Sequence, residues 1–247
     1  MEQEQTNSRS PRRNFLGMLA GGGAALFGLA AMAPLRAAAE PKGGGDSAPA
    51  PGKKSEADQW FEKIKGTHRV VYDAPRTHEV MPFAWPRVFL ITNEGTGSPA
   101  KDCGVVVVLR HEAIAYAFQD EMWAKYNFAE VFKATELGGA FQAADAATAT
   151  KTRNPFWNTK PGDFKLPGFG AVDIGMKDLM ASGVMFCVCQ AAMTVYSAGV
   201  AGHMGQDPKA VVKDWTDHLI PGVQPVPSGV WALGRAQEHQ CAYIFAG

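Results

Sequence analysis

The residues best placed to do chemistry are a cysteine and a histidine at the ends of short apolar runs. Cys189 ends the run 184–189 and precedes a predicted helix, whose N-terminus would stabilise a thiolate. His111 follows the run 103–109, with Glu112 beside it as a candidate proton carrier. Because imidazole is a common activator of a nucleophilic thiol, Cys189 and His111 are the candidate catalytic residues.

Two further polar residues occupy similar positions and complete a set of candidate binding residues with Glu112. Asp73 ends the run 69–73, and Ser228 follows the run 223–226. Each candidate also has a purely structural alternative. A cysteine on a buried strand is commonly an inert small hydrophobe, and a histidine can cap a helix or bond a backbone carbonyl. Asp and Ser are frequent in turns and at helix caps.

The elements that would position these residues alternate between strands and helices. The predicted strands are 69–73, 103–109, 184–189, 223–226 and 242–245. The predicted helices are 82–93, 114–132, 172–180, 191–198, 207–219 and 228–238. The second strand is a continuous β-branched run, which is typical of a strand buried on both faces of a parallel sheet. The pattern predicts an α/β fold, a three-layer α/β/α arrangement around a five-stranded parallel sheet.

Residues 134–170 interrupt this alternation with a loop-like insertion rich in Gly, Pro, Asn and Thr. Its aromatic residues are Phe156, Trp157, Phe164 and Phe169. A loop of this length in a compact domain is uncommon and often functional. We consider two interpretations: a lid or subunit-contact arm, and a surface loop fastened to the domain by its aromatic side chains.

The N-terminus carries the pattern of a twin-arginine export signal. Residues 10–16 read SPRRNFL, the uncharged stretch 17–35 follows, and Ala37–Ala39 offers a cleavage site. We therefore expect residues 1–39 to be a signal peptide and the protein to work in the periplasm or another extracytoplasmic place. The alternative is an uncleaved membrane anchor, for which the stretch is long enough. Residues 40–60, rich in Gly, Pro, Ala, Ser and charge, are expected to be a disordered linker before a single domain, 61–247.

Composition excludes several classes of function. The 24 basic and 24 acidic residues balance, so no basic surface for nucleic acid is predicted. Four cysteines are too few for a disulfide scaffold and lack paired zinc spacing. The chain has no phosphate loop, no dinucleotide-binding glycine pattern and no hydrolase elbow. The sequence therefore predicts no cofactor and no metal site.

Several motifs together resemble the DsrE/DsrF-like family. They are LMASGVMFCVC at 179–189, DHLIPGV at 217–223, PSGV at 227–230, AYI at 242–244, and DEMWAKY at 120–126. The last is similar to a stretch found in longer, exported members. The resemblance covers roughly residues 68 to 247 and is strongest towards the C-terminus.

This resemblance implies a sheet order of four-three-two-one-five, numbered along the chain, and assembly into trimers or hexamers. It also implies sulfur relay through a persulfide on Cys189. In that order the second and third strands are neighbours, so His111 and Cys189 would share one rim. The implied partners are a second copy of the chain, a small sulfur compound or sulfur-carrier protein, and the twin-arginine translocase during export.

No structural disulfide is expected. Cys187 and Cys189 would lie about 6.6 Å apart on one strand with parallel side chains, which is unsuited to bridging. In the family's sheet order, Cys103 and Cys241 would be about 9.6 Å apart, which is too far.

The leading hypothesis is an exported DsrE-like protein that handles or relays sulfane sulfur. The alternative is a non-catalytic, oligomeric module that binds a small ligand or serves assembly, with inert thiols. A third possibility is a metal- or haem-associated accessory protein, although the sequence offers no ligand spacing for one.

Overall fold

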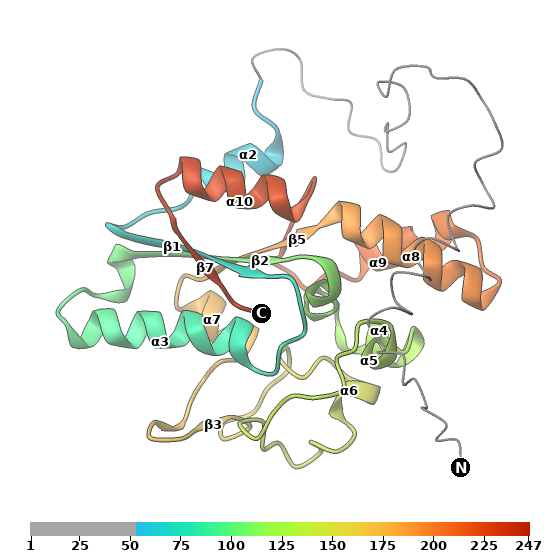
Figure 1. Ribbon diagram of the computed structural model, residues 1–247, viewed down its shortest axis with the longest axis horizontal. Helices are drawn as coiled ribbons and strands as arrows, with labels where there is room; N and C mark the ends of the chain where they lie inside the picture. Colours follow the sequence, from blue (N-terminus) through green and yellow to red (C-terminus); the bar gives the residue numbers. More distant parts are fainter. Residues whose placement is uncertain (1–52) are drawn as a thin grey trace, which may run out of the picture. The chain divides into compact units, whose positions relative to one another are not determined.

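A computed structural model describes residues 53–247, so the expected signal peptide and most of the expected linker lie outside the described part (Figure 1). Five strands form one all-parallel sheet in the order β6-β5-β2-β1-β7. Their bounds are β1 His68–Ala74, β2 Cys103–Leu109, β5 Met185–Cys189, β6 Gln224–Val226 and β7 Ala242–Phe245. The α/β prediction is confirmed, and the order is the one that the family resemblance implied.

Helices cover both faces of the sheet and create two apolar clusters. On one face lie α2 (Glu56–Phe61) and α10 (Gly229–Glu238), and on the other lie α3 (Met81–Gly95) and α7 (Met176–Ala181) (Figure 1). From Val105 to Leu109, successive β2 residues alternate between the two clusters, and every β2 residue is buried. This burial on both faces explains why the strand is a continuous run of valines rather than an alternating pattern.

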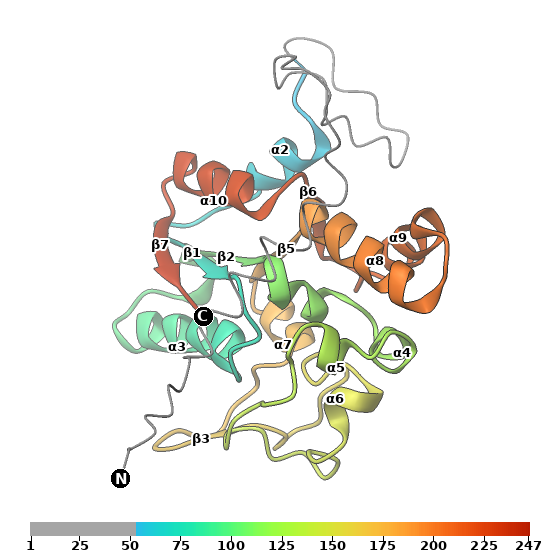
Figure 2. The ribbon, with the colours of Figure 1, turned by 45° about the vertical axis from the view of Figure 1, so that its right-hand side comes forward.

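Two longer helices, α8 (Gln190–Met204) and α9 (Pro208–Asp217), extend beyond the carboxyl end of β5. The long helix α8 directly follows β5, and α9 packs beside it (Figure 2). A short 3-10 helix, η1 (Ala100–Asp102), precedes β2. Among residues 53–247, no helix is sufficiently long and apolar for a membrane span.

The single helix predicted over 114–132 is wrong. The segment forms a 3-10 helix, η2 (His111–Ala117), and two short helices, α4 (Asp120–Lys125) and α5 (Phe128–Val131). Phe118 is extended and bridges to Leu219, while Asn127 adopts a left-handed conformation that ends α4. Residues 113–118 are all fully buried, so their apolar character reflects burial on every side rather than one helical face.

The folded domain begins earlier than residue 61. Helix α2 starts inside the expected linker, and Ser55 and Asp58 form a reciprocal capping box at its N-terminus. Trp60 and Phe61 are buried against the sheet face that α10 also covers. The expectation of disorder therefore fails for this C-terminal end of the linker, because two large aromatic side chains anchor it.

The insertion is built into the domain core. It contains α6 (Ala149–Thr152) and a small hairpin of β3 (Lys165–Leu166) and β4 (Gly170–Ala171). Phe156 is fully buried and stacks between Phe83 and Phe164, at centroid distances of 4.0 and 5.3 Å. Phe169 is exposed. These contacts favour the interpretation of a loop fastened by its aromatics over that of a free lid.

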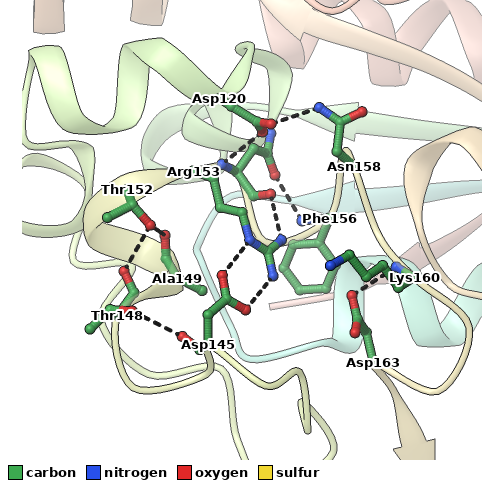
Figure 3. Close-up of polar contacts among 11 residues, drawn as sticks. Asp120, Asp145, Thr148, Ala149, Thr152, Arg153, Phe156, Asn158, Lys160 and Asp163 are labelled. Atoms are coloured by element: carbon green, nitrogen blue, oxygen red, sulfur yellow. Dashed lines mark hydrogen bonds and ion pairs between the residues drawn. The ribbon is translucent and has the colours of Figure 1, made fainter.

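Polar contacts also hold the insertion, some within it and some to the segment 116–120 (Figure 3). Arg153 makes two hydrogen bonds of 2.7 Å to the carboxylate of Asp145. Asp120 of α4 accepts hydrogen bonds from the Asn154 backbone and the Asn158 side chain. The buried Asn154 amide donates to the carbonyls of Tyr116 and Phe118 and accepts from the Phe156 N–H. A buried polar group satisfied in this way specifies one docking geometry.

Candidate functional site at the carboxyl rim of the sheet

The carboxyl ends of β1, β2, β5 and β6 form the rim on which the predicted site depends. Leu109 of β2 pairs with Val188 of β5, so the next residues, Arg110 and Cys189, occupy equivalent positions on neighbouring strands. Asp73 lies on β1, the other neighbour of β2. Because ligands of open α/β sheets gather outside these strand ends, this rim is the natural place for a site.

Cys189 is both the last residue of β5 and the N-cap of α8. Its Sγ accepts a hydrogen bond from the Ala192 N–H at 3.3 Å, the bond that a capping serine or aspartate would make. The residue is 6% exposed. The dipole of α8 favours negative charge at this point, and the Ala192 amide points at the sulfur, so Cys189 lies where an anionic group is electrostatically favoured.

Arg110 belongs to this rim, and Tyr243 of the edge strand β7 reaches Asp73 there with its hydroxyl; neither was predicted as a site residue. The Arg110 guanidinium binds the buried Asp73 carboxylate through Nε and Nη2, at 2.6 and 2.9 Å. The Tyr243 hydroxyl donates to the same carboxylate at 2.8 Å. The hydrogen bond to Asp73 raises the pKa of Arg110, as do the nearby Asp73, Tyr243 and Cys189 charges. The hydrogen bond that Tyr243 donates to Asp73 raises the pKa of Tyr243. Asp73 thus holds Arg110 in place.

Ser228 and the glycine after it complete the rim on the α10 side. Ser228 caps α10, its Oγ accepting from the Trp231 N–H at 3.2 Å, as its sequence position predicted. A Cβ atom on Gly229 would lie 2.5 Å from the Cβ of Arg110. Only glycine at this position leaves room for the Arg110 side chain against the start of α10. The N-terminus of α10 is therefore a second helix N-terminus at the site.

His111 and Glu112 form a separate group at the same rim. The exposed His111 has a left-handed backbone, and its ring contacts the Tyr196 hydroxyl of α8, with Nδ1 at 3.3 Å. Glu112 pairs with Lys133 at 2.6 Å. Burial, with a contribution from Glu112, raises the pKa of Tyr196. Within residues 53–247 no hydrogen bond joins His111 to Cys189, so the expected thiol–imidazole pair is not formed.

All four cysteines are free. Cys187 is fully buried, and this burial raises the pKa of its thiol. Cys103 and Cys241 lie at the amino ends of β2 and β7, on the opposite rim, and burial raises the pKa of Cys241 to about 11. In the part of the chain that the structure describes, no group of three or more His, Cys, Asp or Glu side chains could hold a metal ion.

The rim therefore offers one sulfur, one fixed guanidinium and two helix N-termini, a combination suited to negatively charged sulfur. One sequence signal could have indicated Arg110: it is the first residue after the second strand, one position before the predicted His111.

Comparison with known proteins adds no assignment, because no family model and no curated protein matches the chain.

Proposed function

We propose that this protein is an exported, DsrE-like protein that accepts sulfane sulfur as a persulfide on Cys189. The observation that carries the proposal is the position of Cys189. Its sulfur caps the N-terminus of a 15-residue helix at the carboxyl rim, one strand from the Arg110 guanidinium. The thiolate is the form of a cysteine that attacks sulfane sulfur, and a helix N-terminus interacts favourably with negative charge.

The proposed step is a thiol–sulfane exchange. After the Cys189 proton has left to solvent, the thiolate attacks the outer sulfur of a donor. A bond forms between Cys189 and that sulfur, the donor's own bond to it breaks, and the leaving group departs with the electron pair. The products are a Cys189 persulfide and a reduced donor fragment, so no external oxidant is required.

Extracytoplasmic location and assembly into trimers or hexamers are part of the same proposal. The arginine pair of residues 10–16 supports export. Support for assembly comes from the edge strand β7, where Tyr243, Ile244 and Phe245 are all exposed and lack the charges and prolines that usually protect an edge. Fractionation of cells and light scattering of the purified protein test these two points.

The second candidate is a non-catalytic, oligomeric binding or assembly module with inert thiols. Two observations favour it: Cys189 is almost covered, and His111 contacts Tyr196 rather than the thiol. The two candidates differ in whether Cys189 reacts.

Intact-protein mass spectrometry after incubation with a sulfane-sulfur donor decides between them. We expect a mass increase of one sulfur atom in the wild type and in Cys187→Ser, and none in Cys189→Ser. Peptide mapping assigns the added sulfur. If the wild type gains no sulfur, or if Cys189→Ser gains it equally, the persulfide proposal is wrong and the binding module is favoured.

A further inference from the structure

We infer that the Cys189 site selects a small anionic sulfane-sulfur donor, one whose oxyanion group binds the Arg110 guanidinium. Thiosulfate is the simplest compound of this class. The inference rests on the proposed function and extends it by naming the chemistry of the donor and the residue that recognises it.

The first support is the fixed geometry of Arg110. Two of its three guanidinium nitrogens bind Asp73, and Gly229 lies against its aliphatic stem. Among residues 53–247 the third nitrogen, Nη1, has no hydrogen-bond partner, and the side chain is 27% exposed. A guanidinium held in this way presents preoriented N–H donors, the arrangement that proteins use for planar and tetrahedral oxyanions.

The second support is the local balance of charge. Arg110 and Asp73 cancel, as do Lys133 and Glu112 in the neighbouring group. What remains is the N-termini of α8 and α10, each equivalent to about half a positive charge. A cation that lies across a helix N-terminus is itself in an unfavourable place, since the dipole there favours anions. An oxyanion between Arg110 and the helix ends would relieve this arrangement.

With thiosulfate the exchange balances without a further reagent. The Cys189 thiolate attacks the outer sulfur, a bond forms between the two sulfurs, and the bond between the outer sulfur and the sulfonate breaks. Sulfite leaves with the electron pair. The total charge is conserved, because the thiolate and the dianionic donor become an anionic persulfide and dianionic sulfite. Arg110 would hold the sulfonate end and align the outer sulfur towards Cys189.

The test needs a variant that lacks the guanidinium but does not bury an unpaired carboxylate. The double substitution Asp73→Asn/Arg110→Gln meets this need because the net charge of the pair stays at zero. The matched control is Asp145→Asn/Arg153→Gln, which removes the same kind of bidentate pair from the insertion. Circular dichroism verifies that both variants are folded.

The first measurement compares alkylation of Cys189 by anionic iodoacetate and neutral iodoacetamide. We expect the iodoacetate to iodoacetamide rate ratio to fall about two- to threefold in Asp73→Asn/Arg110→Gln. The variant loses a guanidinium one strand from Cys189 together with a carboxylate one strand further away, so the effect is smaller than the loss of an isolated unit charge. The ratio should not change in the control pair. An unchanged ratio in the rim variant would overturn the inference, whether or not Cys189 accepts sulfur.

The second measurement compares persulfide formation from thiosulfate and from a neutral organic trisulfide. In Asp73→Asn/Arg110→Gln, the rate of persulfide formation from thiosulfate should fall by at least as large a factor as the alkylation ratio. The rate with the trisulfide should fall much less. Equal losses with both donors would overturn anion selection. If neither donor loads wild-type Cys189, the proposed function itself fails, and the alkylation ratio still reports separately on the charge selectivity of the rim.

Discussion

The ion pair between Asp73 and Arg110 gives the most informative prediction about stability, because its two members are unequally buried. The Asp73 side chain is 2% exposed and the Arg110 side chain 27%. Arg110→Gln leaves a carboxylate almost without solvent and with the Tyr243 hydroxyl as its remaining strong donor. Asp73→Asn leaves a guanidinium that water can still reach. The two single substitutions should therefore differ in cost.

The expected magnitudes follow from this asymmetry. Removing one partner of a fully buried pair costs about 3–5 kcal/mol, since an uncompensated charge remains inside. The bond from Tyr243 and the partial exposure of Arg110 reduce this figure. We expect a cost of about 2–4 kcal/mol for Arg110→Gln and about 1–2 kcal/mol for Asp73→Asn. The double variant should cost less than the sum of the singles, because no unpaired charge is left.

Urea unfolding followed by tryptophan fluorescence measures all four proteins of this double-mutant cycle. The midpoints should shift at an unchanged m-value, so that the differences report on stability. Two results would refute the reasoning: costs that add within error, which would mean that the pair is not coupled, or a larger cost for Asp73→Asn than for Arg110→Gln, which would mean that burial of the carboxylate does not dominate.

Three further predictions concern the rest of the domain. Asn154→Ala should lower stability by about 2–4 kcal/mol in thermal or urea unfolding, because three buried backbone groups lose their partner; a cost below about 1 kcal/mol would contradict the role given to this side chain. Cys187 should resist alkylation in the native protein, since burial raises its pKa, and labelling as fast as that of Cys189 would show that the strand is open. The hydrogen bond from Arg153 is the main reason that the pKa of Asp145 lies below its ordinary value. The ionised Asp145 therefore stabilises the fold above about pH 4, and this contribution is lost as the pH falls further. Asp145→Asn should thus be slightly less stable than the wild type at pH 7, and the difference should shrink as the pH falls below about 4. A difference that stays constant in acid would exclude this linkage.

The sheet was predictable from sequence because each strand is a compact apolar run bounded by polar or turn residues. The segment 103–109 needed no partner to be recognised as a buried strand, and Ser228 is a cap by local chemistry alone. The segment 111–132 was not predictable in the same way. A stretch buried on all sides carries no hydrophobic periodicity. Only contacts such as that of Phe118 with Leu219 determine that this segment forms three short helices instead of one.

The candidate site was only half predictable for a related reason. Strand ends can be located from sequence, so Cys189 and Asp73 could be assigned to one rim. The direction of each side chain depends on non-local contacts. The ring of His111 contacts Tyr196, 85 residues away, and Arg110 is fixed by Asp73 from another strand. Tyr243 had no signal of its own, because a tyrosine in an edge strand is ordinary until its hydroxyl is seen to meet a carboxylate.

The different surroundings of Cys187 and Cys189 bear on how sulfur could be retained at this rim. A persulfide on Cys189 could be lost through attack by a second thiol on the same strand. That reaction would release the outer sulfur and form a disulfide. Burial raises the pKa of Cys187, so the neighbouring sulfur stays protonated and is a poor nucleophile. Cys187 and Cys189 are two residues apart on β5, so their Cα atoms lie about 6.6 Å apart with parallel side chains, a poor geometry for a disulfide. The same burial that makes Cys187 inert would therefore protect a sulfur atom carried by Cys189.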